Sequence, residues 1–371
     1  MPDKNGHAFM QRLLRCAGCC AVGATLALAA GCAGSAASPV PAATVTSAAP
    51  VTLTLLAYDS FTPSAGIFEA FTKETGIKVQ LALGGDAGEL VTKAALTAGT
   101  PEGDVLWGVD NTLLSRALQA GMFAPYASPN LAHMDAAVTA LVPGHAATPV
   151  DTGDVCINDD IAWFKARNLA PPLTLQDLAG AAYKDLLVTP SPLTSSPGLA
   201  FLLATVAEFG EDGWQAYWKQ LRANGVLVVD GWTEAYYTEF SGSSGKGSRP
   251  LVVSYGSSPP AEVIYANPPI AEAPTSVVLR TCFRQVEFAG VLRGTAHERE
   301  ARLLVDYLTS VAFQNDLPLT MFVYPVHQGA VLPEAFIRHA QRPAKPLQLD
   351  PARIASQRSA WLDEWTTLVL R

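Results

Sequence analysis

Strand-like and helix-like segments alternate from residue 51 to residue 121, and this alternation constrains the fold more than any other feature. β-Prone runs at 51–57, 78–83 and 104–109 are each followed by a helix-like segment, at 64–75, 86–97 and 110–121. Such alternation is typical of an α/β fold with a mainly parallel sheet, whose functional groups lie at the carboxyl ends of strands. The polar residues at that edge are Tyr58, Asp59, Asp86, Asp110 and Asn111. Asp86, Asp110 and Asn111 are explained equally well as helix caps.

The rest of the chain continues this pattern less regularly. Further strands are expected at 186–190, 251–255 and 285–288, and helices at 199–209, 232–240, 297–309, 311–316 and 356–369. Composition changes near 143–160, where we expect the chain to cross between two lobes, and 321–326 is expected to be another crossing. The 320 or so residues after the N-terminal segment suffice for two lobes of ordinary size.

Aromatic residues gather between residues 229 and 260, although they make up only 8% of the chain. Trp232, Tyr236 and Phe240 are spaced four apart and would share one face of a helix. Tyr255 ends a short apolar run, and the Ser-Ser-Pro sequence after it is typical of a helix start. These rings are either ordinary core or one wall of a ligand site.

A helix N-terminus provides a second candidate site. Residues 191–198 have the sequence SPLTSSPG and precede a strongly apolar helix. With Ser196 as the cap, Pro197 at the first helical position and Gly198 inside the first turn, free backbone N–H groups would suit a phosphate or a carboxylate. A capped helix without any ligand explains the motif at least as well.

The N-terminal segment predicts export. Lys4, Arg12 and Arg15 precede an apolar run over 16–30 that is too short for a confident membrane span. Small residues then lead to Cys32, which predicts a signal peptide at 1–31 and a lipidated cysteine that anchors the chain to the membrane. Plain secretion is the alternative. Residues 32–50 are rich in Ala, Ser, Pro and Thr and predict a disordered tether.

Only two cysteines, Cys156 and Cys282, follow Cys32. Outside the cytoplasm such a pair suggests a disulfide, with two buried free thiols as the alternative. The full chain carries a formal charge of −8 and its first 31 residues a net +2, so the remainder carries −10. This charge argues against nucleic acid or an anionic membrane surface as a partner and is compatible with a cationic ligand.

Motifs for catalysis or cofactor binding do not occur in the sequence. It contains no nucleophile elbow, no HExxH, no Walker loop and no zinc-like spacing of Cys and His. We therefore expect a binding protein without a cofactor or metal rather than an enzyme.

Several motifs in a fixed order resemble one known family from about Leu53 to the C-terminus. They are YDSF (58–61), GVDNTLL (108–114), TSSPGLAFLL (194–203), GWTEAY (231–236), LVVSYGSSPP (251–260), QVEFAG (285–290), FQNDLP (313–318) and YPV (324–326). Together they resemble the bacterial thiamine-binding proteins, the substrate-binding components of thiamine ABC importers. The resemblance implies a monomer of the type II periplasmic-binding fold, in which two α/β lobes joined by a hinge close over a small molecule and deliver it to a permease.

The resemblance also implies domain limits and ligand contacts. Lobe 1 would comprise 51–150 and 286–320, and lobe 2 would comprise 151–285 and 321–371, with Cys156 and Cys282 near the hinge. The implied contacts are Ser195, Ser196 and Gly198 for the hydroxyethyl or phosphate end, Trp232, Tyr236 and Tyr255 around the thiazolium, and Tyr58, Asp59, Asp110 and Asn111 for the aminopyrimidine. Aromatic faces attract such a permanent cation by about 0.5–2 kcal/mol each.

Two departures from the family pattern concern indole rings. The segment 62–67 is shorter than in the family and lacks a Trp. Phe322, a further implied ligand contact, stands where the family has a Trp. The ligand is therefore expected to be thiamine, a phosphate ester of it, or a related heterocycle.

Three other functions stay open from the sequence. Neighbouring Tyr236 and Tyr237 would suit a ferric-ion or other small-cation binding protein of the same fold. A surface-anchored enzyme would need Cys156 as its nucleophile, and an adhesin of the same fold would bind no small molecule.

Overall fold

The computed structural model describes residues 50–244 and 246–371. The described helices and strands all belong to one compact unit, Ala49–Arg371. The predicted signal peptide and lipidated Cys32 lie outside the described residues, as does nearly all of the predicted tether. None of the helices within the described part is long and apolar enough to cross a membrane.

One mixed sheet of nine strands organises the described part of the chain, in the order β2-β1-β3-β8-β4-β7-β5-β6, with β9 paired to β4. The strands are β1 (Thr52–Ala57), β2 (Lys78–Leu83), β3 (Val105–Asp110), β4 (Thr148–Asp160), β5 (Leu187–Pro190), β6 (Leu227–Val229), β7 (Leu251–Tyr255), β8 (Thr275–Val291) and β9 (Tyr324–Pro325). Pairing is parallel at both ends of the sheet, as the alternating pattern predicts, but antiparallel wherever β4 or β8 takes part.

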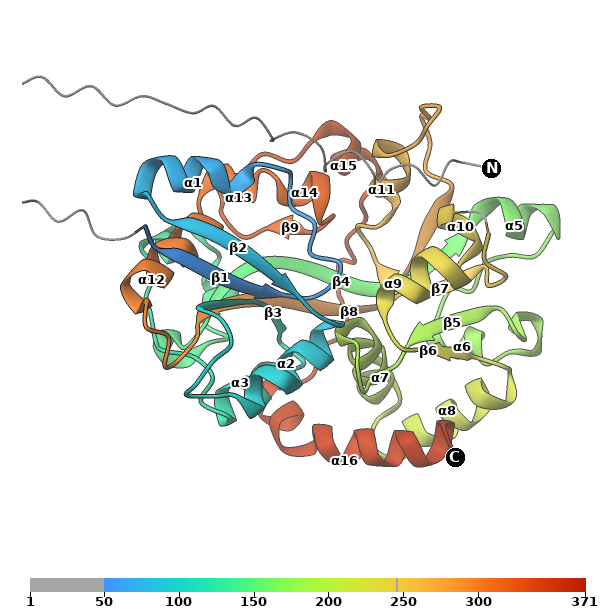
Figure 1. Ribbon diagram of the computed structural model, residues 1–371. Helices are drawn as coiled ribbons and strands as arrows, with labels where there is room; N and C mark the ends of the chain where they lie inside the picture. The colour runs from blue at the N-terminus through green and yellow to red at the C-terminus, as the bar shows by residue number, and fades with distance from the viewer. Residues whose placement is uncertain (1–49, 245) are drawn as a thin grey trace, which may run out of the picture. The chain divides into compact units, whose positions relative to one another are not determined.

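Two long strands, β4 and β8, connect the two ends of the sheet. They pair along most of their length, with register shifts between Pro149 and Asp151 and between Val155 and Ile157. In Figure 1 they run through the middle, between β1–β3 and β5–β7. The sequence pattern predicts only 285–288 of β8 as strand and a crossing at 143–160, because polar residues such as Arg280 and Arg284 interrupt the apolar pattern of β8.

Helices cover both faces of this sheet. They are α1 (Ile67–Thr75), α2 (Ala87–Leu96), α3 (Leu114–Gln119), α4 (Ala136–Thr139), α5 (Ile161–Ala166), α6 (Leu175–Leu178), α7 (Ser196–Phe209), α8 (Trp214–Ala223), α9 (Trp232–Glu234), α10 (Ser241–Ser244), α11 (Pro259–Ile264), α12 (Glu298–Leu308), α13 (Val311–Gln314), α14 (Leu317–Thr320), α15 (Glu334–His339) and α16 (Pro351–Val369). Strand residues alternate between faces, so Leu55 and Trp107 join one core with α1 and α12, whereas Leu56 and Leu106 join another with α2, α7 and α8.

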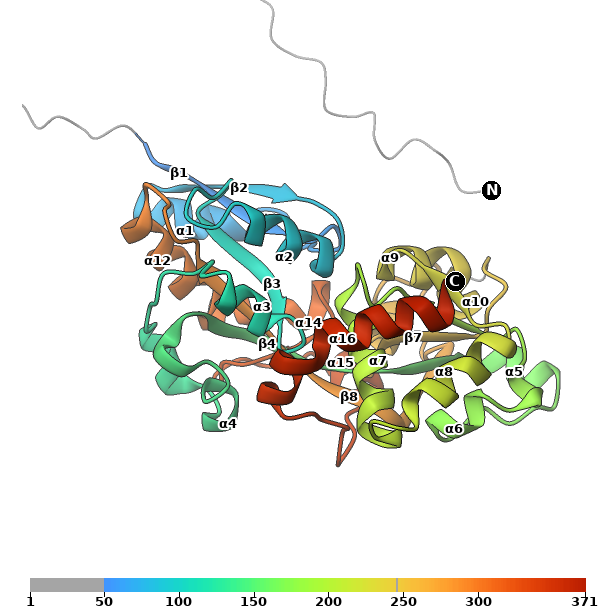
Figure 2. The ribbon, with the colours of Figure 1, turned by 90° about the horizontal axis from the view of Figure 1, so that it is seen from below.

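The C-terminal helix α16 closes the second core. Its Trp365 is fully buried and meets Trp218 of α8 edge to face, with ring centroids 5.5 Å apart. The helix also contacts α3, so it reaches elements at both ends of the sheet (Figure 2). Trp361 and Trp365 are therefore packing residues, as their spacing predicts.

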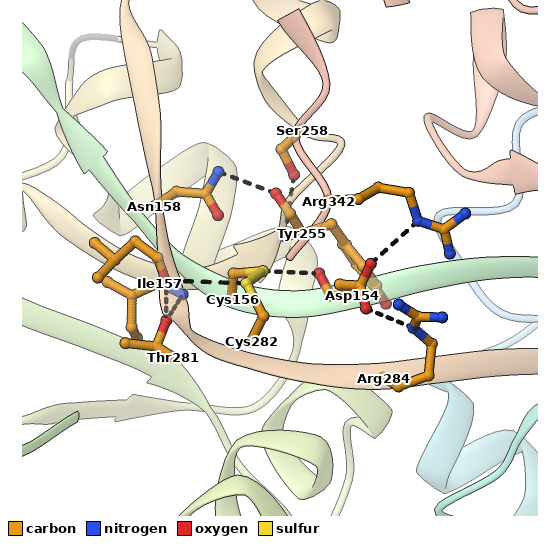
Figure 3. The surroundings of a disulfide bond; sticks show 11 residues. Asp154, Cys156, Ile157, Asn158, Tyr255, Ser258, Thr281, Cys282, Arg284 and Arg342 are labelled. Carbon is orange, nitrogen blue, oxygen red and sulfur yellow. Dashed lines mark hydrogen bonds and ion pairs between the residues drawn. A yellow bond between two sulfur atoms is a disulfide. The ribbon is translucent and has the colours of Figure 1, made fainter. Parts of the chain in front are cut away.

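A disulfide joins the two long strands. Cys156 of β4 and Cys282 of β8 are bonded, with their Cα atoms 4.1 Å apart, at the register shift between Val155 and Ile157 (Figure 3). The buried carboxylate of Asp154, two residues before Cys156, accepts hydrogen bonds from Arg284 (2.6 Å) and Arg342 (3.4 Å). Covalent and ionic links thus hold β4 to its neighbours.

Candidate ligand-binding site

A cavity of about 300 Å³ lies where several strand ends and helix starts meet. Its lining comes from the segment after β1, the start of α2, β4, the start of α7, α9 and the turn after it, the end of β7, α11, β8 and the segment before β9. Seven of the eleven predicted ligand contacts line it, namely Tyr58, Asp59, Ser196, Trp232, Tyr236, Tyr255 and Phe322. Strand ends and helix starts therefore do converge on one cavity, as the α/β pattern predicts.

Four other predicted residues, Asp110, Asn111, Ser195 and Gly198, do not line this cavity. Asp110 is fully buried and caps the turn after β3, accepting hydrogen bonds from Thr112 and, at 2.7 Å, from Gln285. Asn111 is bonded to the backbone of Arg284 and Val286 on β8. Their polar groups are satisfied within the protein, so the interpretation of both as structural residues fits the geometry better.

The start of α7 differs from the expected arrangement by one residue. Ser195, not Ser196, occupies the cap position, and it makes no side-chain cap hydrogen bond. Gly198 lies against the strand end: a Cβ atom there would come within 2.5 Å of the Pro190 carbonyl oxygen. The glycine therefore permits close packing of helix and strand, while Ser196 and Pro197 face the cavity.

An aromatic wall forms one side of the cavity. The rings of Trp232 and Tyr236 stack with centroids 5.0 Å apart and an interplanar angle of 16°, and Tyr255 lies 6.3 Å from Trp232. The Trp232 indole N–H donates to Ser254 at 2.9 Å, which fixes the ring plane. Phe240 lies behind Tyr236 and is fully buried. The helix predicted at 232–240 is a short α-turn followed by a π-helical turn, Ala235–Glu239.

Asp86 links two parts of the cavity lining. Its Oδ1 accepts from the Ala87 backbone N–H at 2.6 Å at the start of α2, and its Oδ2 accepts from the Trp232 backbone N–H at 2.9 Å. Burial raises the pKa of Asp86 to about 6, although these hydrogen bonds lower it. The sequence pattern identifies Asp86 as a cap or edge residue, and its contact with Trp232 is formed only by the tertiary structure.

Two acids from the long strands, Asp151 and Glu287, complete the lining, and both were missed from the sequence. They are register partners across β4 and β8. Tyr58 donates its hydroxyl to Glu287 Oε2 at 3.0 Å, and Trp107 donates its indole N–H to the same atom at 3.2 Å. Burial raises the pKa of Asp151 to about 7 and the pKa of Glu287 well above its usual value. An isolated Glu within the apolar VEFAG stretch was the available signal.

The lining of the cavity contains acidic side chains but no basic ones among the described residues. Four carboxyl groups line the cavity, those of Asp59, Asp86, Asp151 and Glu287, whereas no Lys, Arg or His among the described residues does. Aromatic faces and carboxylates together favour a cation. No group of three or more His, Cys, Asp or Glu side chains in the described part is arranged to hold a metal ion.

Comparison with known proteins agrees with this fold. Residues 103–350 match the family model for bacterial extracellular solute-binding proteins. The thiamine-binding periplasmic proteins of Salmonella typhimurium and Escherichia coli are 32% and 31% identical, each match covering 86% of this chain and 94% of the relative. A solved periplasmic thiamin binding protein superposes with a TM-score of 0.75 at 28% identity, covering 86% of this chain and 96% of that one.

The fold is that of the type II periplasmic binding proteins, and the protein is a solute-binding protein. Within that class, the chain belongs to the family of bacterial thiamine-binding proteins.

Proposed function

We propose that this protein captures thiamine, or a thiamine phosphate, outside the cytoplasm and delivers it to the permease of an ABC importer. The observation that carries the proposal is the cavity itself, in which an aromatic wall faces four carboxyl groups and no basic side chain among the described residues. Thiazolium is a permanent cation, and both kinds of group stabilise it. The names of the relatives, all thiamine-binding, support the same ligand.

The lining suggests how the ligand would lie. The thiazolium would contact Trp232, Tyr236 and Tyr255, and the amino group of the pyrimidine would donate to the carboxylates and to Tyr58. The hydroxyethyl end would reach Ser196 at the start of α7. Because carboxyl groups surround the remaining space, a phosphate would be less well compensated, so we expect thiamine to bind at least as tightly as its phosphates.

Closure of two lobes over the ligand is part of the proposal, with lobe 1 at 51–150 and 286–320 and lobe 2 at 151–285 and 321–371. Contacts between the proposed lobes support it: Asp86 accepts from the Trp232 backbone, and the Glu89 N–H donates to the Thr194 carbonyl at 3.1 Å. A permease would then distinguish the closed, loaded form from the open one.

The proposed anchor is a lipid on Cys32, with residues 32–50 as a tether and a monomer as the working form. Labelling of the full chain with a radioactive fatty acid tests the anchor. Incorporation that is lost in Cys32→Ser is expected, whereas equal incorporation in both would remove Cys32 as the lipidated residue.

Calorimetric titration tests the ligand. The mature domain is unfolded and refolded to remove carried-over solute, then titrated with thiamine, its monophosphate and its diphosphate. One-to-one binding of any of them supports the proposal and ranks the three. The absence of heat from all three, with a folded protein, would reject it, and a visible charge-transfer band on adding ferric iron would then favour the iron-binding alternative.

A further inference from the structure

Two acids lie side by side in the wall of the cavity. Asp151 on β4 and Glu287 on β8 are register partners, both line the cavity, and their exposed fractions are only 3% and 4%. Two buried carboxyl groups this close cannot both be charged without a large electrostatic cost, so such a pair holds a proton at neutral pH.

Hydrogen bonds identify one carboxyl oxygen of the pair that carries no proton. Glu287 Oε2 already accepts from Tyr58 and Trp107 and is therefore an unprotonated oxygen. Asp151 Oδ2 is buried and has no hydrogen-bond partner among the described residues. An unpartnered buried carboxyl oxygen is costly to maintain. Since Asp151 lines the cavity, a donor or cation on a bound ligand would supply the missing partner.

The surroundings of the pair add negative rather than positive charge. The titratable groups that interact electrostatically with the Asp151–Glu287 pair are Asp110, Tyr58 and Tyr255. Asp86 in turn interacts with Tyr255. The side-chain amide of Gln285 donates hydrogen bonds to Asp110 Oδ2 at 2.7 Å and to Ser196 Oγ at 3.0 Å. It therefore does not compensate the charge of the Asp151–Glu287 pair. Among the described lining residues no basic side chain is available, which leaves a ligand as the source of positive charge.

We propose that the Asp151–Glu287 pair is an exchangeable counter-charge for the ligand: Glu287 keeps its proton, whereas the proton that Asp151 holds in the free protein passes to the solvent when a cationic ligand binds. The only bond broken is the O–H bond of the carboxyl group, and the proton passes to water. This inference rests on the proposed function, because it takes the thiazolium as the cation.

The affinity for a cationic ligand should depend on pH. A neighbouring cation favours the charged carboxylate and lowers its pKa. Because the pKa of Asp151 in the free protein is raised to about 7, ligand binding near pH 7 releases protons, and affinity for the cation rises with pH through that range. A neutral ligand of the same shape would release none.

Calorimetry near pH 7, in buffers of different ionisation enthalpy, measures the released protons directly. The probes are thiamine and its neutral analogue with a thiophene ring in place of the thiazolium. We expect the wild-type protein to release up to one proton per thiamine and none with the analogue. Asp151→Asn should abolish the release and weaken thiamine about tenfold, whereas Asp363→Asn, a matched change at an exposed residue of α16, should behave like wild type.

The outcomes separate the inference from the proposed function. Thiamine binding without proton release, or with release unchanged in Asp151→Asn, would overturn the inference and leave the function standing. If Asp151→Asn does not fold, Asp151→Ser serves the same comparison. Failure of the wild type to bind thiamine and both of its phosphates would reject the proposed function. The infrared band of protonated carboxyl groups should weaken when thiamine binds near pH 7, and a band that does not change on binding would overturn the inference by itself.

Discussion

At the scale of single residues, each side chain in the aromatic wall is held by a specific partner. Trp232 is oriented by Tyr236 on one face and by Ser254 at its indole nitrogen. Tyr236 is buried and donates its hydroxyl to Glu262 at 3.0 Å. The ring that would stack on a ligand is thus set in place before any ligand arrives, which lowers the entropic cost of binding.

Replacing Trp232 with alanine should weaken thiamine binding by about 1–3 kcal/mol, since a central aromatic contact of a binding site is removed. Trp232→Phe keeps an aromatic face but loses the hydrogen bond to Ser254, so a smaller loss is expected. Calorimetric titration of both variants measures the difference. An unchanged affinity in Trp232→Ala would place this ring outside the site.

Glu262 should make the stability of the free protein depend on pH. Burial raises its pKa from 4.5 to about 7, so the folded protein binds this proton more tightly than the unfolded chain does. Its contribution is complete below the unfolded pKa and is lost as pH rises through about 7. In Glu262→Gln the fall in unfolding free energy between pH 5 and pH 8 should be smaller by about 1–2 kcal/mol.

Urea unfolding at the two pH values measures this effect. Glu334→Gln, at an exposed position of α15, is the matched control and should retain the wild-type slope. Identical slopes in the Glu262 variant and the wild type would show that this carboxyl group keeps its ordinary pKa in the folded protein.

At the scale of elements, three short strands follow their local sequence and the two long strands do not. The strands at 52–57, 78–83 and 251–255 were predicted within a residue or two, because each is a compact β-prone run. The first half of β8 was missed, since positions such as Arg280 and Arg284 carry polar side chains that erase the apolar signal. Such a strand forms because β4 lies beside it.

The disulfide between those strands should contribute to stability only in its oxidised form. Cys156→Ser should lower the melting temperature under oxidising conditions, because the cross-link between β4 and β8 no longer restricts the unfolded chain. Under reducing conditions the variant and the wild type should melt at similar temperatures. A wild-type melting temperature that is the same with and without a reductant would contradict a stabilising role for the bond.

At the scale of the whole molecule, the proposed closure depends on close approach between α2 and the loop before α7. A Cβ atom on Gly88 would lie 2.4 Å from the Thr194 carbonyl oxygen, the acceptor of the Glu89 N–H. Little room for a side chain therefore exists between these two segments when they are in contact.

Gly88→Ala should weaken ligand binding without weakening the free protein. The added methyl group would separate α2 from the Thr194 loop, whereas alanine within a helix is more favourable than glycine by about 1 kcal/mol. Calorimetric affinity and the melting temperature of the ligand-free protein measure the two effects. Gly84→Ala, where no atom lies within 4 Å of the added Cβ, is the control. Unchanged affinity in Gly88→Ala would exclude this contact from closure.

The sequence by itself determined the α/β class, the aromatic cluster around Trp232 and the start of α7 to within one residue, because alternation, spacing and capping act over a few residues. Only the tertiary structure decided which acids face the cavity. Asp110 and Asn111 stand at a strand end yet are satisfied by Gln285 and the backbone of β8. Asp151 and Glu287 meet through the register of two strands distant in the chain, and their raised pKa values come from burial, a property that no local pattern contains.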